Sequence, residues 1–163
     1  MRLITIVIPL LLAACAGPIE TRIDSRGLTT VQPVSFAADS LATGVITGGQ
    51  SMVAQALLAK GYRAADIADI SLQVTVSDRP ANLSLLSGTD VLAATSDKKR
   101  CATREYRLGV TLTKIADGSL FYQSHAAEFH CKLTVSEALP MLVDAALKDI
   151  GAPRGSYTVT RPR

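Results

Sequence analysis

The sequence is poor in aromatic residues and contains no tryptophan. Aromatic residues make up only 4% of the 163 positions, so most of the 48% apolar content is aliphatic. After Cys15, no apolar run approaches the ~20 residues that a membrane-spanning helix needs. The formal charge is only +3 and the basic residues are scattered, which argues against a nucleic-acid-binding protein. The composition instead predicts a globular chain, and its length fits a single domain.

Sequence motifs of catalytic sites are also missing. We find no serine nucleophile elbow, no glycine-rich phosphate loop and no paired-carboxylate site. The stretch from His125 to His130 resembles a zinc protease signature, but it has one residue too many between Glu128 and the second histidine. On a strand, residues five apart point to opposite faces, and on a helix they lie about 140° apart, so they cannot share one metal. We therefore predict no catalytic residues, no metal and no cofactor, and a protein that is not an enzyme.

The first fifteen residues have the composition of an export signal. Arg2 is followed by an apolar run over 3–12, which is too short to cross a bilayer, and then by Leu12-Ala13-Ala14-Cys15. These last four residues resemble the lipobox of bacterial lipoproteins. The resemblance implies cleavage before Cys15, a diacylglycerol on its thiol and an acyl chain such as palmitate on the new amine. Because Ala16 is not the aspartate that retains such proteins in the inner membrane, it also implies anchoring at the periplasmic face of the outer membrane. An ordinary secretory signal with a chance cysteine is the alternative.

We expect three regions: a signal peptide over 1–14, a lipidated cysteine with a short tether over 15–27, and a single domain over 28–163. Apolar alternation predicts strands, whereas helical periodicity and a capping box at Thr134 predict helices. The strands are expected at 28–37, 67–76, 102–115, 119–133 and, at an edge, 154–163; the helices are expected at 50–60 and 134–150. This order predicts the α+β class, with a twisted, mainly antiparallel sheet and two helices packed on one face.

The central feature of the predicted sheet is a long hairpin that turns at Ala116-Asp117-Gly118. If Ile115 lies opposite Ser119, then Tyr122 lies opposite Leu112, and the even-numbered residues of both strands face the core.

The segment 78–100 is a long excursion that interrupts the predicted sheet. Its large apolar residues are candidates for contacts with a partner, because long loops inside compact domains are often functional. These candidates are Leu83, Leu85, Leu86, Val91 and Leu92. The alternative is a short structural element packed on the core.

Two cysteines remain besides Cys15, and in an oxidising compartment Cys101 and Cys131 predict a disulfide. In the hairpin register above, Cys131 faces Thr103, and Cys101 lies two residues beyond on the same face. Diagonal neighbours lie about 7–8 Å apart, slightly beyond the usual Cα separation of a disulfide, so a small distortion is expected. A metal cluster of these cysteines with His125 is the alternative.

Two stretches resemble a known family. One is Lys60-Gly61-Tyr62 followed by Ala68-Asp69-Ile70, and the other is the hairpin from Leu108 to Tyr122 followed by a helix. Together they resemble the Gram-negative lipoproteins grouped as domain of unknown function 4136, over roughly residues 28–151. Tyr122 stands where that family tends to have tryptophan. The resemblance implies no catalytic residues, because the family has none established.

These observations favour a non-catalytic, lipid-anchored periplasmic lipoprotein that acts as a binding or assembly module for an envelope protein partner. A carrier or sensor of a small apolar ligand is the alternative, and a periplasmic hydrolase or thiol enzyme is a third hypothesis. An apolar cavity between sheet and helices would support a carrier.

Overall fold

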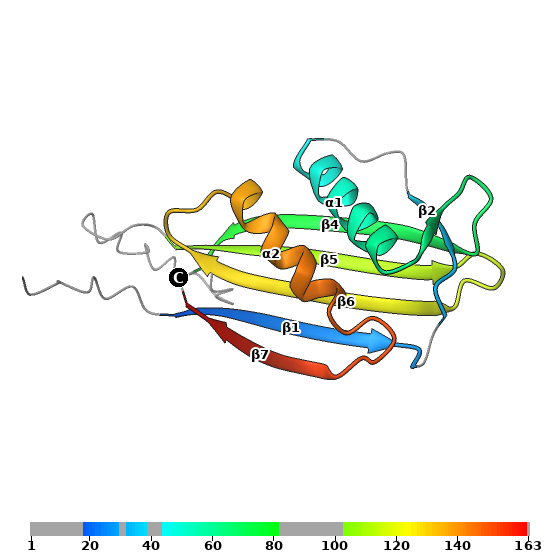
Figure 1. The fold of residues 1–163 in the computed structure, drawn as a ribbon. Helices are drawn as coiled ribbons and strands as arrows, with labels where there is room; N and C mark the ends of the chain where they lie inside the picture. The colour runs from blue at the N-terminus through cyan, green and yellow to red at the C-terminus, as the bar shows by residue number, and fades with distance from the viewer. Residues whose placement is uncertain (1–17, 30–31, 39–43, 82–102, 163) are drawn as a thin grey trace, which may run out of the picture.

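The fold is a single curved sheet with two helices on one side (Figure 1). The computed structural model describes residues 18–29, 32–38, 44–81 and 103–162. Within these residues the strands are β1 (Ile19–Gly27), β2 (Ser35–Ala38), β3 (Arg63–Ala64), β4 (Ile70–Pro80), β5 (Arg104–Lys114), β6 (Leu120–His130) and β7 (Gly155–Arg161), and the helices are α1 (Val45–Ala59) and α2 (Val135–Leu147).

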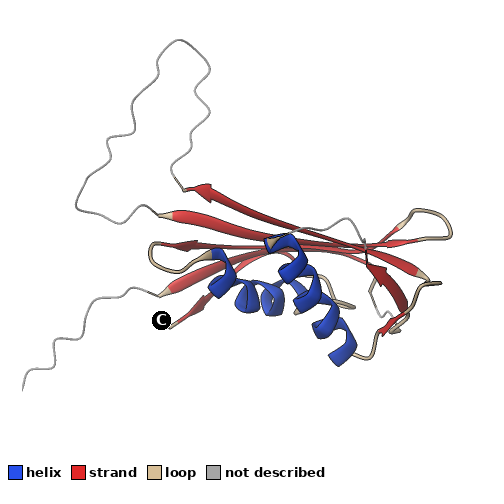
Figure 2. Ribbon diagram, turned by 90° about the horizontal axis from the view of Figure 1, so that it is seen from above, coloured by secondary structure: helices blue, strands red, loops and turns tan. Residues whose placement is uncertain are grey.

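The strand order across the sheet is β3-β2-β4-β5-β6-β1-β7. Strand β2 runs parallel to β3 and β4, and every other pairing is antiparallel. Both helices lie on the same face, and no helix of the described residues covers the other (Figure 2). The predicted α+β class, with a mainly antiparallel sheet and two helices on one face, is confirmed.

The long hairpin has the predicted register from Leu112 outward, but the predicted pairing of Ile115 with Ser119 is wrong, because the Lys114 amide donates to the Ser119 carbonyl. Leu112 lies opposite Tyr122, and the pairing continues without a shift to Arg104 opposite His130. An irregularity after Leu112 moves the register near the turn by one residue. Gly118 is left-handed with φ of 69°, as expected for this turn.

The hydrophobic core lies between the sheet and the two helices. It is built from the even-numbered face of β5 and β6, the alternating residues of β4 and the inner stripes of both helices. Its most buried members include Phe36, Val53, Leu57, Ile70, Leu72, Leu108, Val110, Leu112, Tyr122, Leu142 and Leu147. The capping box that begins α2 is complete: Thr134 Oγ1 accepts from the Glu137 amide, and the Glu137 carboxylate accepts from the Thr134 amide.

The tether predicted up to Gly27 is wrong, because the chain from Ile19 onward is β1, which lies between β6 and β7. Its inward residues are Ile19, Thr21, Ile23 and Ser25, and all four are buried. Two of these residues carry hydroxyl groups, so the apolar alternation is only half visible in the sequence. The hydroxyls are satisfied by Glu128 and Asp149, far away in the chain.

The first helix begins at Val45, five residues before its predicted start. The pair Gly48-Gly49 hides this first turn, because glycine is a poor helix former. Gly49 packs closely on the sheet: a Cβ there would come within 3.0 Å of the Val76 side chain. This glycine therefore allows α1 to approach β4.

Other predicted boundaries also shift. The strand expected from residue 28 begins at Ser35, and the strand expected from residue 67 begins at Ile70, with Ile67 95% exposed before it. Strand β4 continues to Pro80, so the excursion predicted from Asp78 starts later than expected. The rest of that excursion, over 82–100, lies outside the described residues.

Candidate functional site

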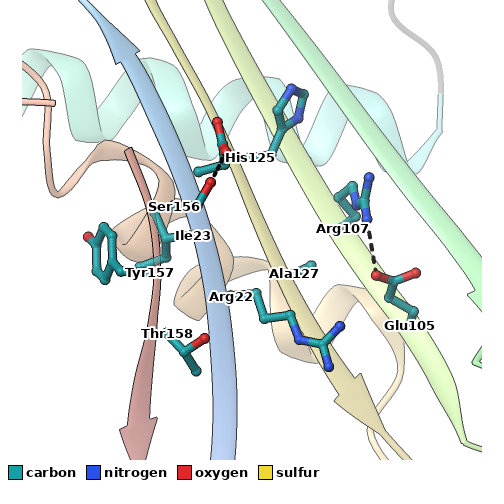
Figure 3. Close-up of a pocket in the computed structure, with 10 residues that line it drawn as sticks. Arg22, Ile23, Glu105, Arg107, His125, Ala127, Ser156, Tyr157 and Thr158 are labelled. Carbon is teal, nitrogen blue, oxygen red and sulfur yellow. Dashed lines mark hydrogen bonds and ion pairs between the residues drawn. The ribbon is translucent and has the colours of Figure 1, made fainter. Parts of the chain in front are cut away.

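The uncovered face of the sheet carries a cleft of about 500 Å³ that spans β5, β6, β1 and β7 (Figure 3). Most of its lining comes from outward-facing positions of these strands, which lie side by side because alternate residues share one face. The lining residues are Arg22, Ile23, Asp24, Glu105, Arg107, His125, Ala127, Ser156, Tyr157 and Thr158. Most of these residues are polar or charged, and the charges are of both signs.

Glu105 is the most enclosed charged group of this cleft, with 4% of its surface exposed. Its carboxylate pairs with the Arg107 guanidinium at 3.2 Å and with Arg79. Burial alone would raise the pKa of Glu105, but the hydrogen bonds from Arg79 and Arg107 outweigh it and lower the pKa. Glu105 is thus held as a carboxylate, and its charge is compensated.

The rest of the cleft offers cationic and hydroxyl groups. The Arg22 guanidinium lies 4.8 Å from the centre of the Phe129 ring, a cation–π contact. The Ser156 hydroxyl donates to the Asp24 carboxylate. His125 lies against Gly109, where a Cβ would come within 2.9 Å of His125 Nδ1. Such a surface can bind a polar or charged group.

A second polar cluster lies on the opposite, helix-covered face. Glu128 is fully buried and accepts hydrogen bonds from Thr21 Oγ1 and, at 2.8 Å, from Arg161 Nη2. His130 Nε2 lies 2.7 Å from the same carboxylate, and the Tyr106 ring stacks on the His130 ring. Burial alone would raise the pKa of Glu128, but these hydrogen bonds outweigh it and lower the pKa. The cluster ties β6, β1 and β7 together.

Cavities of about 310 and 370 Å³ border this cluster along α2. The first lies between α2 and β7, with Met141 and Val159 among its walls. The second lies at the end of the sheet beside Ile19 and Leu133. Both lie at the margin of the core, whereas the centre of the sheet–helix interface is filled by side chains such as Leu108 and Leu142, which are fully buried.

At the far end of α2, Asp149 forms a third cluster. Its carboxylate accepts hydrogen bonds from Ser25, Tyr157 and Arg154 at 3.0, 2.7 and 2.9 Å. Burial alone would raise the pKa of Asp149, but these hydrogen bonds outweigh it and lower the pKa. The cluster joins the end of α2 to β1 and β7.

The two histidines lie on opposite faces of the sheet, as predicted: His125 in the cleft and His130 under α2. Within the described residues, no group of three or more histidine, cysteine, aspartate or glutamate side chains is arranged to hold a metal ion.

Of the other predicted site residues, Cys131 alone is among the described residues; it follows β6 directly and interacts with a partner. Cys101 lies outside the described residues, so the disulfide stays a prediction. Cys15 and the partner-contact candidates Leu83, Leu85, Leu86, Val91 and Leu92 also lie outside them.

The buried carboxylates were not predicted from the sequence. Glu128 had a visible signal, because it sits at an inward position between Ala126 and His130, where an acidic residue needs a partner. Glu105 and Asp149 had none, because the sequence places Glu105 on the outward face of a predicted strand and Asp149 in the last turn of a predicted helix.

Comparisons with known proteins show a shared fold but do not assign the chain to a family. No protein-family model matches the chain, and no curated protein matches it either. The PelC dodecamer from Paraburkholderia phytofirmans has a TM-score of 0.54 at 13% identity and covers 82% of this chain and 99% of its own. A variant of the same protein has a TM-score of 0.50 at 14% identity.

A PDZ domain protein from Parabacteroides distasonis has a TM-score of 0.59 at 10% identity. The match covers 88% of this chain but only 39% of that one. At these identities the likeness shows a shared fold alone. No described helix is long and apolar enough to cross a membrane.

Proposed function

We propose that this chain is a non-catalytic lipoprotein, anchored by lipid on Cys15 to the periplasmic face of the outer membrane, whose domain acts as a binding or assembly module. The observation that carries the proposal is the position of β1. The strand begins at Ile19, only four residues after the lipobox cysteine. A lipid on Cys15 would therefore hold the start of β1 within about 14 Å of its attachment point.

This short connection would keep one end of the domain close to the membrane. The start of β1 lies at the same end of the sheet as the end of β6 and the start of β5. The segment between Ala81 and Thr103 leaves and returns at this end, where the Ala81 amide donates to the Thr103 carbonyl. We propose that its apolar residues Leu83, Leu85, Leu86, Val91 and Leu92 contact an envelope protein partner there, and that Cys101–Cys131 fastens the segment to β6.

A role in assembly is supported by two further points. The fold is shared with PelC, which forms a dodecamer in its crystals. The sequence also resembles the lipoproteins grouped as domain of unknown function 4136, for which no catalytic residues are established.

The proposal is tested by replacing the cysteine that would carry the lipid. We expect Cys15→Ser to leave the precursor uncut or to move the protein out of the outer-membrane fraction. The matched control is Ala16→Ser, which keeps the thiol and should fractionate like the wild type. If Cys15→Ser and the wild type have the same mobility on a gel and the same distribution among fractions, the lipid anchor is wrong.

A further inference from the structure

Strand β7 forms one edge of the sheet, and no other described strand pairs with its outer side. Within the described residues it pairs with β1 only, along seven consecutive residues without a register shift. Its sequence, GSYTVTR, contains no proline or lysine. Natural sheets usually protect a long edge with such residues, with a bulge or with a very short strand. The opposite edge follows that rule, because β3 has only two residues.

We infer that β7 pairs with β7 of a second copy of this chain, so that two sheets join into one across a two-fold axis. The inference specifies the assembly part of the proposed function and does not require the lipid anchor. An axis perpendicular to the sheet keeps the helices of both copies on one side. Odd-numbered residues of β7 in one copy then lie opposite odd-numbered residues of β7 in the other. The reason is that alternate residues share a face, and the helix-covered faces of both copies lie on the same side.

Full overlap of the seven residues places Thr158 on the axis. On the helix side, Tyr157 then lies opposite the partner subunit's Val159, an aromatic–β-branched pair that occurs twice by symmetry. On the open side, Ser156 lies opposite the partner subunit's Thr160. Aromatic–β-branched and hydroxyl pairs are favourable cross-strand neighbours in antiparallel sheets.

The charges of the strand fit the same register. Arg161 is the only charged residue of β7, and in this register it lies opposite the partner subunit's Gly155. Like charges therefore do not face each other, which would be unfavourable. The strand is self-complementary, and for this reason we commit to a second copy and not to an unrelated strand.

The surroundings of β7 also favour an added strand. The open-face cleft reaches its Ser156 and Thr158, and the cavity beside α2 reaches its Val159 and Arg161. Alternate side chains of an added strand lie above and below the sheet, next to these two spaces. Tyr157 and Val159 are only half-buried in the single chain, and a second strand would cover them further.

The arrangement agrees with anchoring of both copies in one membrane. Ile19 lies opposite Arg161 in the β1–β7 pairing, so the two starts of β1 lie toward opposite ends of the joined strands. An axis along the membrane normal places both starts at the same height above the membrane. The joined sheet would then lie along the membrane surface.

A single cysteine on the axis tests the pairing. In Thr158→Cys, the two new thiols face each other at a Cα separation of about 4.5–5.5 Å, which suits a disulfide. The full-length variant is expressed in cells, membrane and soluble fractions are treated with a copper–phenanthroline oxidant, and dimer is measured on a non-reducing gel. The wild-type chain gives the background from its own cysteines.

Thr160→Cys is the matched control on the same strand and the same face. Its thiol lies four residues from the partner's Thr160, or about 13 Å, too far for a disulfide. We expect at least tenfold more dimer from Thr158→Cys than from Thr160→Cys. The double variant Ser156→Cys with Thr160→Cys should form dimer again, because these two positions face each other across the axis.

Three results would overturn the inference. The first is no dimer from Thr158→Cys although its thiol reacts with a maleimide. The second is equal dimer yields from Thr158→Cys and Thr160→Cys, which indicates random collisions. The third is a crosslink from Thr158→Cys to a different protein, which would make β7 a docking strand for another partner. Repeating the assay in the Cys15→Ser background separates failure of the pairing from failure of the anchor.

Discussion

Three carboxylates of this protein, Glu105, Glu128 and Asp149, lie almost out of contact with water, with 4%, 0% and 4% of their surface exposed. Burial would favour their neutral forms, yet each accepts several hydrogen bonds, at least one of them from an arginine guanidinium. The hydrogen bonds prevail, and all three pKa values are lowered. A carboxylate with a lowered pKa in the folded chain stabilises the fold above its unfolded pKa, near pH 4, and loses this contribution as the pH falls through its folded value.

The pH dependence gives a prediction for Asp149. Asp149→Asn removes the charge beside Arg154 and weakens the hydrogen bonds from Ser25 and Tyr157, so we expect a loss of about 1–3 kcal/mol of unfolding free energy at pH 7. The loss should shrink near pH 3, which is below the pKa of an aspartate in the unfolded chain, because proton binding by the unfolded carboxyl then offsets part of the advantage of the folded carboxylate. Urea denaturation of both proteins at the two pH values measures it.

Asp144→Asn is the control for this measurement. Asp144 lies on the exposed side of α2, and this change should alter the unfolding free energy by at most about 0.5 kcal/mol. A difference between Asp149→Asn and the wild type that is as large at pH 3 as at pH 7 would contradict the role given to the Asp149 charge.

At the scale of single elements, predictions from the sequence succeeded where local patterns were complete. The hairpin register followed from apolar alternation everywhere except beside the turn, where it shifts by one residue, and α2 followed from the Thr134–Glu137 capping box. Strand β1 could not be predicted, because Thr21 and Ser25 face inward and their partners lie more than 100 residues away. The start of α1 could not be predicted for a related reason. A glycine at position 49 disfavours a helix locally, and only its close contact with β4 in the folded chain accounts for it.

The place of β1 in the sheet predicts a strong effect of Ile23→Ala. Ile23 is 3% exposed, so removing its side chain should lower the unfolding free energy by about 2–4 kcal/mol. Ile67→Ala is the control, because Ile67 is 95% exposed and its loss should change the unfolding free energy by at most about 0.5 kcal/mol. Equal effects in urea denaturation would mean that 19–27 does not belong to the folded domain.

At the scale of the whole molecule, the two faces of the sheet differ in character. One is covered by both helices (Figure 2), whereas no described helix covers the other, which carries the cleft. The layout of sheet and helices could be predicted, because it follows from the order and periodicity of the elements. The cleft could not, because its lining comes from four strands that are adjacent only after folding. The sheet edge at β7 depends in the same way on the strand order.

Because only three residues separate Cys15 from β1, the proposed lipid anchor would determine how the domain is held at the membrane. It is tested most directly by the mass of the N-terminal tryptic peptide of wild-type protein purified from the outer-membrane fraction. We expect this peptide to span residues 15–22, to begin with Cys15 and to carry a diacylglycerol on the thiol with an acyl chain on the amine. A peptide that begins elsewhere, or that begins with an unmodified Cys15, would contradict the lipid anchor.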